Sequence, residues 1–200
     1  RSRRNRGGSE INRVLTSRMD ENKKLILHIC CAPDATVPGE ELLKEGYRTT
    51  GFFYGSNIHP EEEFIKRSEA VRSLCRMKGM DCHIMEYDPQ TWISVTEGFA
   101  SEPEGGKRCP LCFELQLRAA AKYAAAIGAG FVTTTLTISP HKDPDLINKI
   151  GEDISSEYGL EWIPRIWRKN NGFKRSVEES KILGLYRQDY CGCIYSIRNR

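Results

Sequence analysis

Short apolar runs alternate with longer amphipathic segments through most of this chain, and this alternation restricts the fold more than any other feature. Five runs have the length and the β-branched or aromatic content of buried strands, at residues 25–29, 49–54, 82–85, 131–135 and 161–166. Segments with helical spacing lie between them, and this order is typical of a parallel sheet with helices on both faces. The sequence therefore predicts an α/β fold, a Rossmann-like three-layer α/β/α sandwich.

The expected helices begin and end at recognisable signals. The segment after Pro60 opens with three glutamates, which favour the positive end of a helix dipole, and it closes at Gly79. Further helices are expected after Pro38 up to residue 46, and over residues 111–127, 144–158 and 176–183, with a loop over residues 88–108. The last helix is expected to form a C-terminal helical cap. Residues 23–200 should thus make a single domain, preceded by a flexible basic arm at residues 1–22.

Composition and charge narrow the class of protein. The 200 residues are 39% hydrophobic and 28% charged, which suits one soluble domain and excludes a disordered or collagen-like chain. No apolar stretch reaches the roughly 18 residues of a membrane span, so we expect no membrane partner. Residues 1–24 hold eight Lys/Arg against three Asp/Glu, and residues 164–200 hold nine against three. Such basic ends suit a polyanion, although a solubilising tail and a solvated helix face would give the same pattern.

Six of the eight cysteines fall into three tight clusters, which points to a metal site in a reducing compartment. The clusters are Cys30-Cys31, Cys109-x-x-Cys112 and Cys191-x-Cys193. Adjacent or one-apart cysteines rarely bond each other, whereas thiol clusters from distant segments are how a chain surrounds a metal. Four thiolates suffice for zinc or a four-iron cluster, so two further thiolates and Asp34 would hold a second metal ion. Cys75 and Cys82 lack such neighbours and are expected to be small buried side chains.

Two other interpretations of the cysteines stay open on the residues alone. A non-catalytic RNA-binding protein could hold structural zinc with the later two clusters, although Cys30, Cys31 and Asp34 would then be unexplained. Cys109 and Cys112 open an expected helix, where the dipole would lower the pKa of a redox dithiol, as in a thiol–disulfide oxidoreductase.

The segments after the expected strands should meet at one edge of the sheet, because ligands of open parallel sheets bind beyond the carboxyl ends of the strands. Asp34 follows the first strand, Asn57 and His59 follow the second, and His141 and Lys142 follow the fourth. The two histidines are therefore candidates for proton delivery or phosphate contact.

Taken as an ordered set, these motifs resemble the QueH-type epoxyqueuosine reductases over about residues 25–195. The resemblance rests on Cys30-Cys31-Ala32-Pro33-Asp34, Ser56-Asn57-Ile58-His59-Pro60, Arg108-Cys109-Pro110-Leu111-Cys112-Phe113, Ser139-Pro140-His141-Lys142, Asn171-Gly172-Phe173-Lys174-Arg175-Ser176 and Tyr186-Arg187-Gln188-Asp189-Tyr190-Cys191-Gly192-Cys193. It implies the nucleotide-hydrolase-like group of Rossmann folds. ATP is not expected, because the cysteine pair after the first strand stands where that group has a serine- and glycine-rich loop.

The resemblance also implies an activity and its cofactors. The domain would be the metal-binding catalytic part of a cytoplasmic bacterial enzyme that removes the epoxide oxygen of epoxyqueuosine at the tRNA wobble position. It would use a 4Fe-4S cluster and an adjacent mononuclear iron, without cobalamin. We expect the iron held by two thiolates and Asp34 to bind the epoxide oxygen while the cluster supplies electrons. Which cysteines hold which metal stays open. The expected partners are tRNA and an unidentified electron donor, and we expect a monomer.

The same motifs supply candidates for proton transfer and substrate binding. Asp189, His141 or Tyr190 would protonate the departing oxygen. The Lys and Arg residues of the segment 165–175 and Lys142 would contact phosphates, and Phe173 or Tyr186 could stack on a base. The full set expected to bind substrate is Asn57, His59, Lys142, Phe173, Lys174, Arg175 and Arg187.

Overall fold

Five parallel strands form one sheet in the order β3-β2-β1-β4-β5. They are β1 (Lys24–His28), β2 (Arg48–Phe53), β3 (Asp81–Ile84), β4 (Phe131–Thr134) and β5 (Glu161–Trp162). The structure is a computed structural model that describes residues 23–197, so the arm expected at residues 1–22 lies outside it. The central strand β1 pairs with β2 on one side and β4 on the other, and its Leu25, Ile26 and Leu27 are at most 1% exposed.

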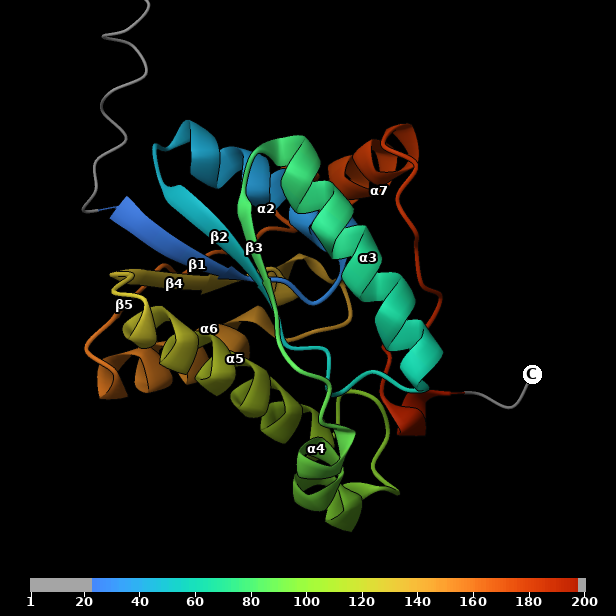
Figure 1. Ribbon diagram of the computed structural model, residues 1–200. Coiled ribbons are helices and arrows are strands. Elements are labelled where there is room, and N and C mark those ends of the chain that lie inside the picture. Colours follow the sequence, from blue (N-terminus) through green and yellow to red (C-terminus); the bar gives the residue numbers. More distant parts are fainter. Residues whose placement is uncertain (1–22, 198–200) are drawn as a thin grey trace, which may run out of the picture.

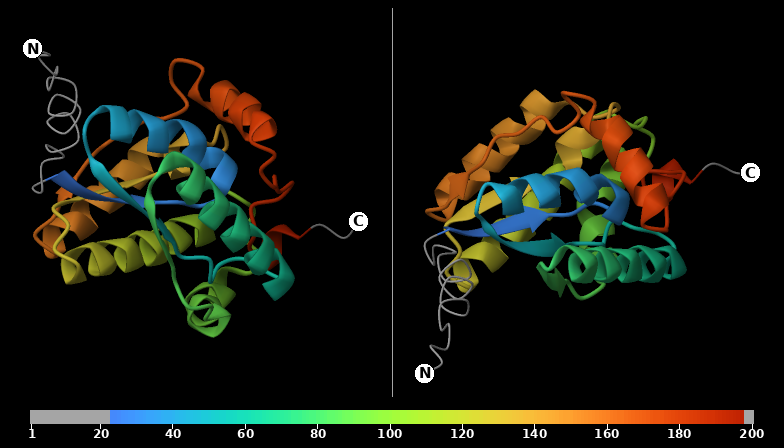
Figure 2. Two further views of the ribbon diagram at one scale, coloured as in Figure 1. Left: turned by 45° about the horizontal axis from the view of Figure 1, so that its top comes forward. Right: turned by 90° about the horizontal axis from the view of Figure 1, so that it is seen from above.

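Helices cover both faces of the sheet, so the predicted three-layer α/β/α sandwich is confirmed (Figures 1 and 2). One layer holds α2 (Ala32–Lys44), α3 (Glu61–Lys78) and α7 (Gly172–Ile182), and the other holds α4 (Pro89–Thr96), α5 (Arg108–Ala126) and α6 (Pro144–Glu157). Each layer packs on its own hydrophobic cluster, one between the sheet and α2 and α3, the other between the sheet and α5 and α6. None of the described helices has the length and apolar character needed to cross a membrane.

Three elements differ most from the expected ones, and α5 and α7 begin three and four residues earlier than expected. Helix α2 begins directly after Cys31 and contains Pro38. Its early start is possible because Pro33 occupies the first turn, where a backbone N–H has no helical partner. The segment expected to be a loop contains α4, whose N-cap Asp88 accepts a hydrogen bond from Thr91 N at 3.2 Å. Strand β5 has two residues rather than six, since it pairs with β4 only at Phe131 and Val132 before the chain turns away.

The chain after β5 crosses to the other layer, where α7 packs against α2 as the expected C-terminal cap. Residues 183–197 then run past α3 and end in a short 3₁₀ helix at Ile194–Ser196 (Figure 1). This return path brings Cys193 into the hydrophobic cluster between the sheet and α5 and α6.

Candidate metal centre

The centre lies at the carboxyl ends of β1 and β4, where the order of strands in the sheet reverses. Chain connections leave these two neighbours in opposite directions, and ligands of open α/β sheets bind at this kind of switch point. Cys30 follows β1, and its backbone N–H donates to Oγ1 of Thr135, the residue directly after β4, at 3.1 Å. This hydrogen bond joins the ends of the two strands at the candidate ligand Cys30.

Cys30, Cys31 and Asp34 form the first of two thiol groups in this centre. Cys31 is the N-cap of α2 and Asp34 stands in its first turn, so the start of the helix holds both side chains in place. Their ligand atoms and the Cys30 sulfur all lie within 4.8 Å of one another. The Cys30 thiol donates to Asp34 Oδ2 at 3.3 Å, and its sulfur lies 3.2 Å from Thr135 Oγ1. We call these three residues the Cys30 group.

The second group comes from two distant segments and holds four thiols. Its members are Cys109 and Cys112 of α5 and Cys191 and Cys193 of the C-terminal loop. The Cys112 sulfur accepts hydrogen bonds from Trp92 Nε1 at 3.2 Å and Gln116 Nε2 at 3.1 Å. The Cys109 sulfur accepts one from the exposed Gly105 N at 3.2 Å. We call these four residues the Cys112 group.

Arg67 of α3 fixes the loop that carries the last two cysteines. Its side chain is 2% exposed, and it donates to the carbonyls of Cys191 at 3.0 Å and Tyr190 at 3.2 Å. Gly192 has φ 120°, and an added Cβ there would lie 2.9 Å from Arg67 Nη1. His59 N donates to the Gly192 carbonyl at 2.8 Å from the other side. The loop is thus held in a backbone conformation that favours glycine at this position.

The electrostatics of the two groups favour a bound cation. Burial raises the pKa of the Cys31 and Cys112 thiols, and it raises that of Cys191 to about 11. Burial also disfavours the charged form of Lys142, yet the charges of Cys191, Cys30 and Asp34 hold the pKa of its ammonium group above the ordinary value. Cys193 belongs to the hydrophobic cluster between the sheet and α5 and α6, and Cys30, Cys109 and Cys112 also pack against that cluster. A metal would stabilise the thiolates that burial disfavours.

The donor atoms of both groups fit iron. Within residues 23–197, the Cys30 group is the only set of three or more His, Cys, Asp or Glu side chains with the spacing of a single ion. The four thiols of the Cys112 group do not meet that spacing, although the charges of Cys191, Cys193 and Cys109 all act on Cys112. Four soft thiolates arranged more widely suit a ligand larger than one ion, such as a four-iron cluster.

Several residues predicted from the sequence border this centre. His59 is 7% exposed with neither ring nitrogen hydrogen-bonded, and burial lowers its pKa. Asn57 is 8% exposed in the same loop. The Tyr190 hydroxyl donates to the His59 carbonyl. His141 and Asp189 are both exposed, and His141 N donates to Ser139 Oγ at 3.3 Å.

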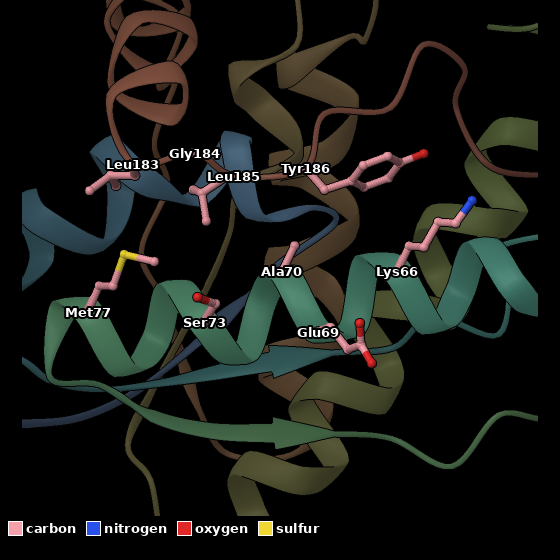
Figure 3. A pocket seen from close by; sticks show the side chains of 9 residues that line it. All are labelled: Lys66, Glu69, Ala70, Ser73, Met77, Leu183, Gly184, Leu185 and Tyr186. Carbon is pink, nitrogen blue, oxygen red and sulfur yellow. The ribbon is translucent and has the colours of Figure 1, made fainter.

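The candidates on α7 contact the core and acidic side chains, and those after it precede the loop that carries Cys191 and Cys193. Phe173 packs against the core between the sheet and α2, while the exposed Lys174 and Arg175 form ion pairs with Glu178 and Glu41 at 3.9 and 2.8 Å. Arg187 is exposed. Tyr186, a candidate for base stacking, lines a groove between α3 and residues 183–186 and donates to Glu63 Oε2 at 2.8 Å (Figure 3). No cysteine lines that groove.

Four residues of the centre were not predicted from the sequence. They are Arg67, Trp92, Gln116 and Thr135. Gln116 stands four residues after Cys112, so their shared helix face was a usable signal. Trp92 lies in the segment expected to be a loop, and Arg67 comes from a helix that only the tertiary fold brings to the cysteines, so nothing local marked either.

Comparisons with known proteins identify relatives of this chain. A sequence profile described as epoxyqueuosine reductase QueH matches residues 25–199. Epoxyqueuosine reductase QueH of Streptococcus pyogenes serotype M1 is 36% identical over 180 residues, which span 87% of this chain and 70% of that protein. The QueH of Haemophilus influenzae is 38% identical over 182 residues, or 90% of this chain and 74% of that protein.

Among solved structures, the U34-tRNA thiolase NcsA from Methanococcus maripaludis with its 4Fe-4S cluster aligns with a TM-score of 0.54, over 90% of this chain and 62% of that one. At 13% identity this likeness concerns the fold alone. Fold and centre together define a Rossmann-like α/β protein with thiol groups at the switch point of its sheet. The chain belongs to the QueH family of epoxyqueuosine reductases, which are oxidoreductases, and the resemblance drawn from its motifs is confirmed.

Proposed function

We propose that this chain reduces epoxyqueuosine in tRNA to queuosine, using a four-iron cluster and a neighbouring single iron. One observation carries the proposal: two thiol groups of different spacing, one of them with Asp34, pack at one end of the sheet. Family membership supplies the reaction, and the centre supplies the ligands for the metals that this reaction needs. Neither ATP nor cobalamin takes part in the proposed reaction.

The spacing of the thiols supports a division of the ligands. The Cys30 group would hold the single iron, because Asp34 adds a hard oxygen to two thiolates at single-ion spacing. The Cys112 group would hold the cluster, since four thiolates are its usual ligand set. Removing the epoxide oxygen as water takes two electrons and two protons, and the bound metals would supply electron transfer and a Lewis acid.

Side chains around the metals would bind the oxygen and move the protons. The Lys142 ammonium, whose pKa is held above its ordinary value beside Asp34 and the cysteines, would attract the departing oxygen. Asp189, His141 and Tyr190 stay candidates for the acid that protonates it. Because the Tyr190 hydroxyl donates to a backbone carbonyl, its task in the free enzyme would be to position the loop.

A basic segment beside the centre would hold the tRNA. Arg168 donates to the Lys142 carbonyl at 2.8 Å, which fixes the segment 164–175 against the loop that carries Lys142. Lys174, Arg175 and Arg187 are exposed and would contact phosphates, which position the tRNA without reading its sequence. A cytoplasmic monomer served by a separate electron donor completes the proposal.

Metal analysis and turnover on anaerobically purified protein test the proposal. We expect a brown protein with about five iron atoms per chain that converts epoxyqueuosine in tRNA to queuosine when a chemical reductant is supplied. Asp34→Ala should lose about one iron and all turnover but keep the visible absorption of the cluster. Cys112→Ser should lose that absorption. Cys75→Ser, a buried cysteine outside both groups, should keep both metals.

Two outcomes would replace the proposal. A colourless protein that holds zinc would point to the non-catalytic RNA-binding alternative. A metal-free protein whose activity survives loss of Cys191 and Cys193 would point to a thiol–disulfide oxidoreductase that works through Cys109 and Cys112.

A further inference from the structure

Two buried side-chain N–H groups converge on one sulfur of the Cys112 group. Trp92 Nε1 lies 3.2 Å and Gln116 Nε2 3.1 Å from Cys112 Sγ. Within the described part of the chain, no other thiol of this group accepts from a side-chain donor. The cluster ligands are therefore not equivalent, because Cys112 alone accepts two hydrogen bonds from buried side chains.

The burial of both donors makes this arrangement hard to replace by water. Trp92 is 0% exposed and Gln116 3% exposed, so an N–H group that lost the sulfur would be left without a partner. The Gln116 amide nitrogen also lies 3.1 Å from the Cys112 carbonyl, which fixes its orientation. By contrast, Cys109 accepts from the backbone N–H of Gly105, which is exposed and open to solvent.

Hydrogen bonds to a ligand sulfur act on the reduction potential of an iron–sulfur cluster, because they stabilise the more negative, reduced state. We propose that Trp92 and Gln116 are positioning residues that raise the reduction potential of the four-iron cluster by donating to Cys112 Sγ. This inference rests on the proposed function, since it requires a cluster on the Cys112 group. It assigns a redox role to α4, which supplies Trp92 from outside the cysteine motifs.

Redox titration of the anaerobic protein, followed by electron paramagnetic resonance, tests the inference with Trp92→Phe and Gln116→Leu. Each variant lacks one N–H donor, so at a fixed potential the ratio of reduced to oxidised cluster should fall by up to about tenfold, equivalent to about 59 mV for one electron. The double variant should shift further than either single one.

Trp162→Phe is the matched control. Trp162 is also buried, and its Nε1 donates to Asn148 Oδ1 at 3.1 Å, so its loss removes an indole N–H that no sulfur accepts. The control should keep the wild-type potential. Variants that hold the cluster at the wild-type potential would overturn the inference and leave the proposed function intact, whereas a protein without a four-iron cluster would overturn both.

A second measurement, on protein that keeps Trp92, tests the inference even if the Trp92→Phe variant does not fold. With ¹⁵N in the tryptophan side chains, pulsed paramagnetic resonance of the reduced protein should detect one indole nitrogen coupled to the cluster. The coupling should persist in Trp162→Phe and in Trp167→Phe, whose indole donates to the Thr134 carbonyl at 2.8 Å. Absence of any coupling, or its loss in either of these variants, would contradict the inference.

Discussion

Arg67 shows how one buried charge can shape the candidate metal centre without being one of its expected ligands. Its Nε donates to Glu63 Oε1 at 2.7 Å, one turn earlier on α3, and both side chains are under 10% exposed. The guanidinium lies 5.0 Å from the Tyr190 ring centroid and bonds two loop carbonyls. A buried cation is tolerable only where its hydrogen bonds are satisfied, and here the C-terminal loop satisfies them. Folding of that loop is therefore coupled to completing the hydrogen bonds of the Arg67 guanidinium.

Replacing Arg67 by Met should lower the free energy of unfolding by roughly 3–5 kcal/mol, because the Glu63 carboxylate would stay buried without its partner. The double variant Glu63→Gln with Arg67→Met should recover part of that stability but not the iron of the Cys112 group, since the loop would still lack its anchor. Urea denaturation and iron analysis measure the two effects. Arg72→Met, an exposed change on the same helix, serves as control, and a loss no larger than the control's would contradict the coupling.

The sequence indicated the candidate ligands of the centre but not the side chains around them. Spacing alone singled out all six clustered cysteines and Asp34, because metal-binding thiols repeat at short intervals within a segment. It could not predict that Trp92 and Arg67 meet those cysteines, since both contacts arise from packing between helices distant in sequence. Their residue types are common in ordinary cores and surfaces.

At the scale of elements, helices with a strong hydrophobic period were predicted well, whereas short or proline-containing helices were not. Helix α3 runs over Glu61–Lys78 as its acidic start and terminal glycine indicated. Helix α4 lies in a segment expected to be a loop, because its eight residues are too few for a clear helical period. Helix α2 begins six residues before Pro38, which resembles a helix start. Both errors fall beside the centre, where tertiary contacts override local preference.

An ion-pair network joins three helices of one layer, and it predicts a pH dependence of stability. Lys78 at the end of α3 pairs with Glu40 of α2 at 3.1 Å and with Glu179 of α7. Hydrogen bonds from Lys44 and Lys78 lower the pKa of Glu40 from 4.5 to about 2. Because the folded state lowers this pKa, the stabilisation is complete above pH 4.5 and is lost as the pH falls towards 2.

Lys78→Met should therefore cost roughly 1 kcal/mol at pH 7, as expected for partly exposed pairs, and the difference from the wild type should shrink between pH 4.5 and 2. Chemical denaturation at pH 7 and pH 3 measures it. Lys149→Met removes an exposed pair with Asp153 on α6 and should show a smaller effect at either pH. A Lys78→Met deficit that stays constant with pH would show that Glu40 does not depend on this lysine.

At the scale of the whole molecule, charge is distributed unevenly around the centre. In the described part of the chain, residues 164–197 carry seven Lys/Arg against three Asp/Glu, while residues 25–163 are net acidic. Arg168 ties the start of the basic stretch to the loop that bears Lys142, so the positive charge begins next to the thiols and continues along α7. A tRNA held there by its phosphates would gain affinity from counterion release, and this affinity would decrease with rising salt concentration.

Arg175 offers the clearest test of that surface. It is exposed on α7 and pairs with Glu41 at 2.8 Å, and since exposed pairs contribute little to stability, Arg175→Ala should leave the fold intact. If Arg175 contacts a phosphate, the variant should bind tRNA more weakly, and the slope of log affinity against log salt should fall by about one. Arg118→Ala removes the pairs with Glu114 of α5 and Glu157 of α6, in the opposite layer, and should leave that slope unchanged. Binding titrations over a range of salt concentrations measure both, and an unaltered slope in Arg175→Ala would place the tRNA elsewhere on the molecule.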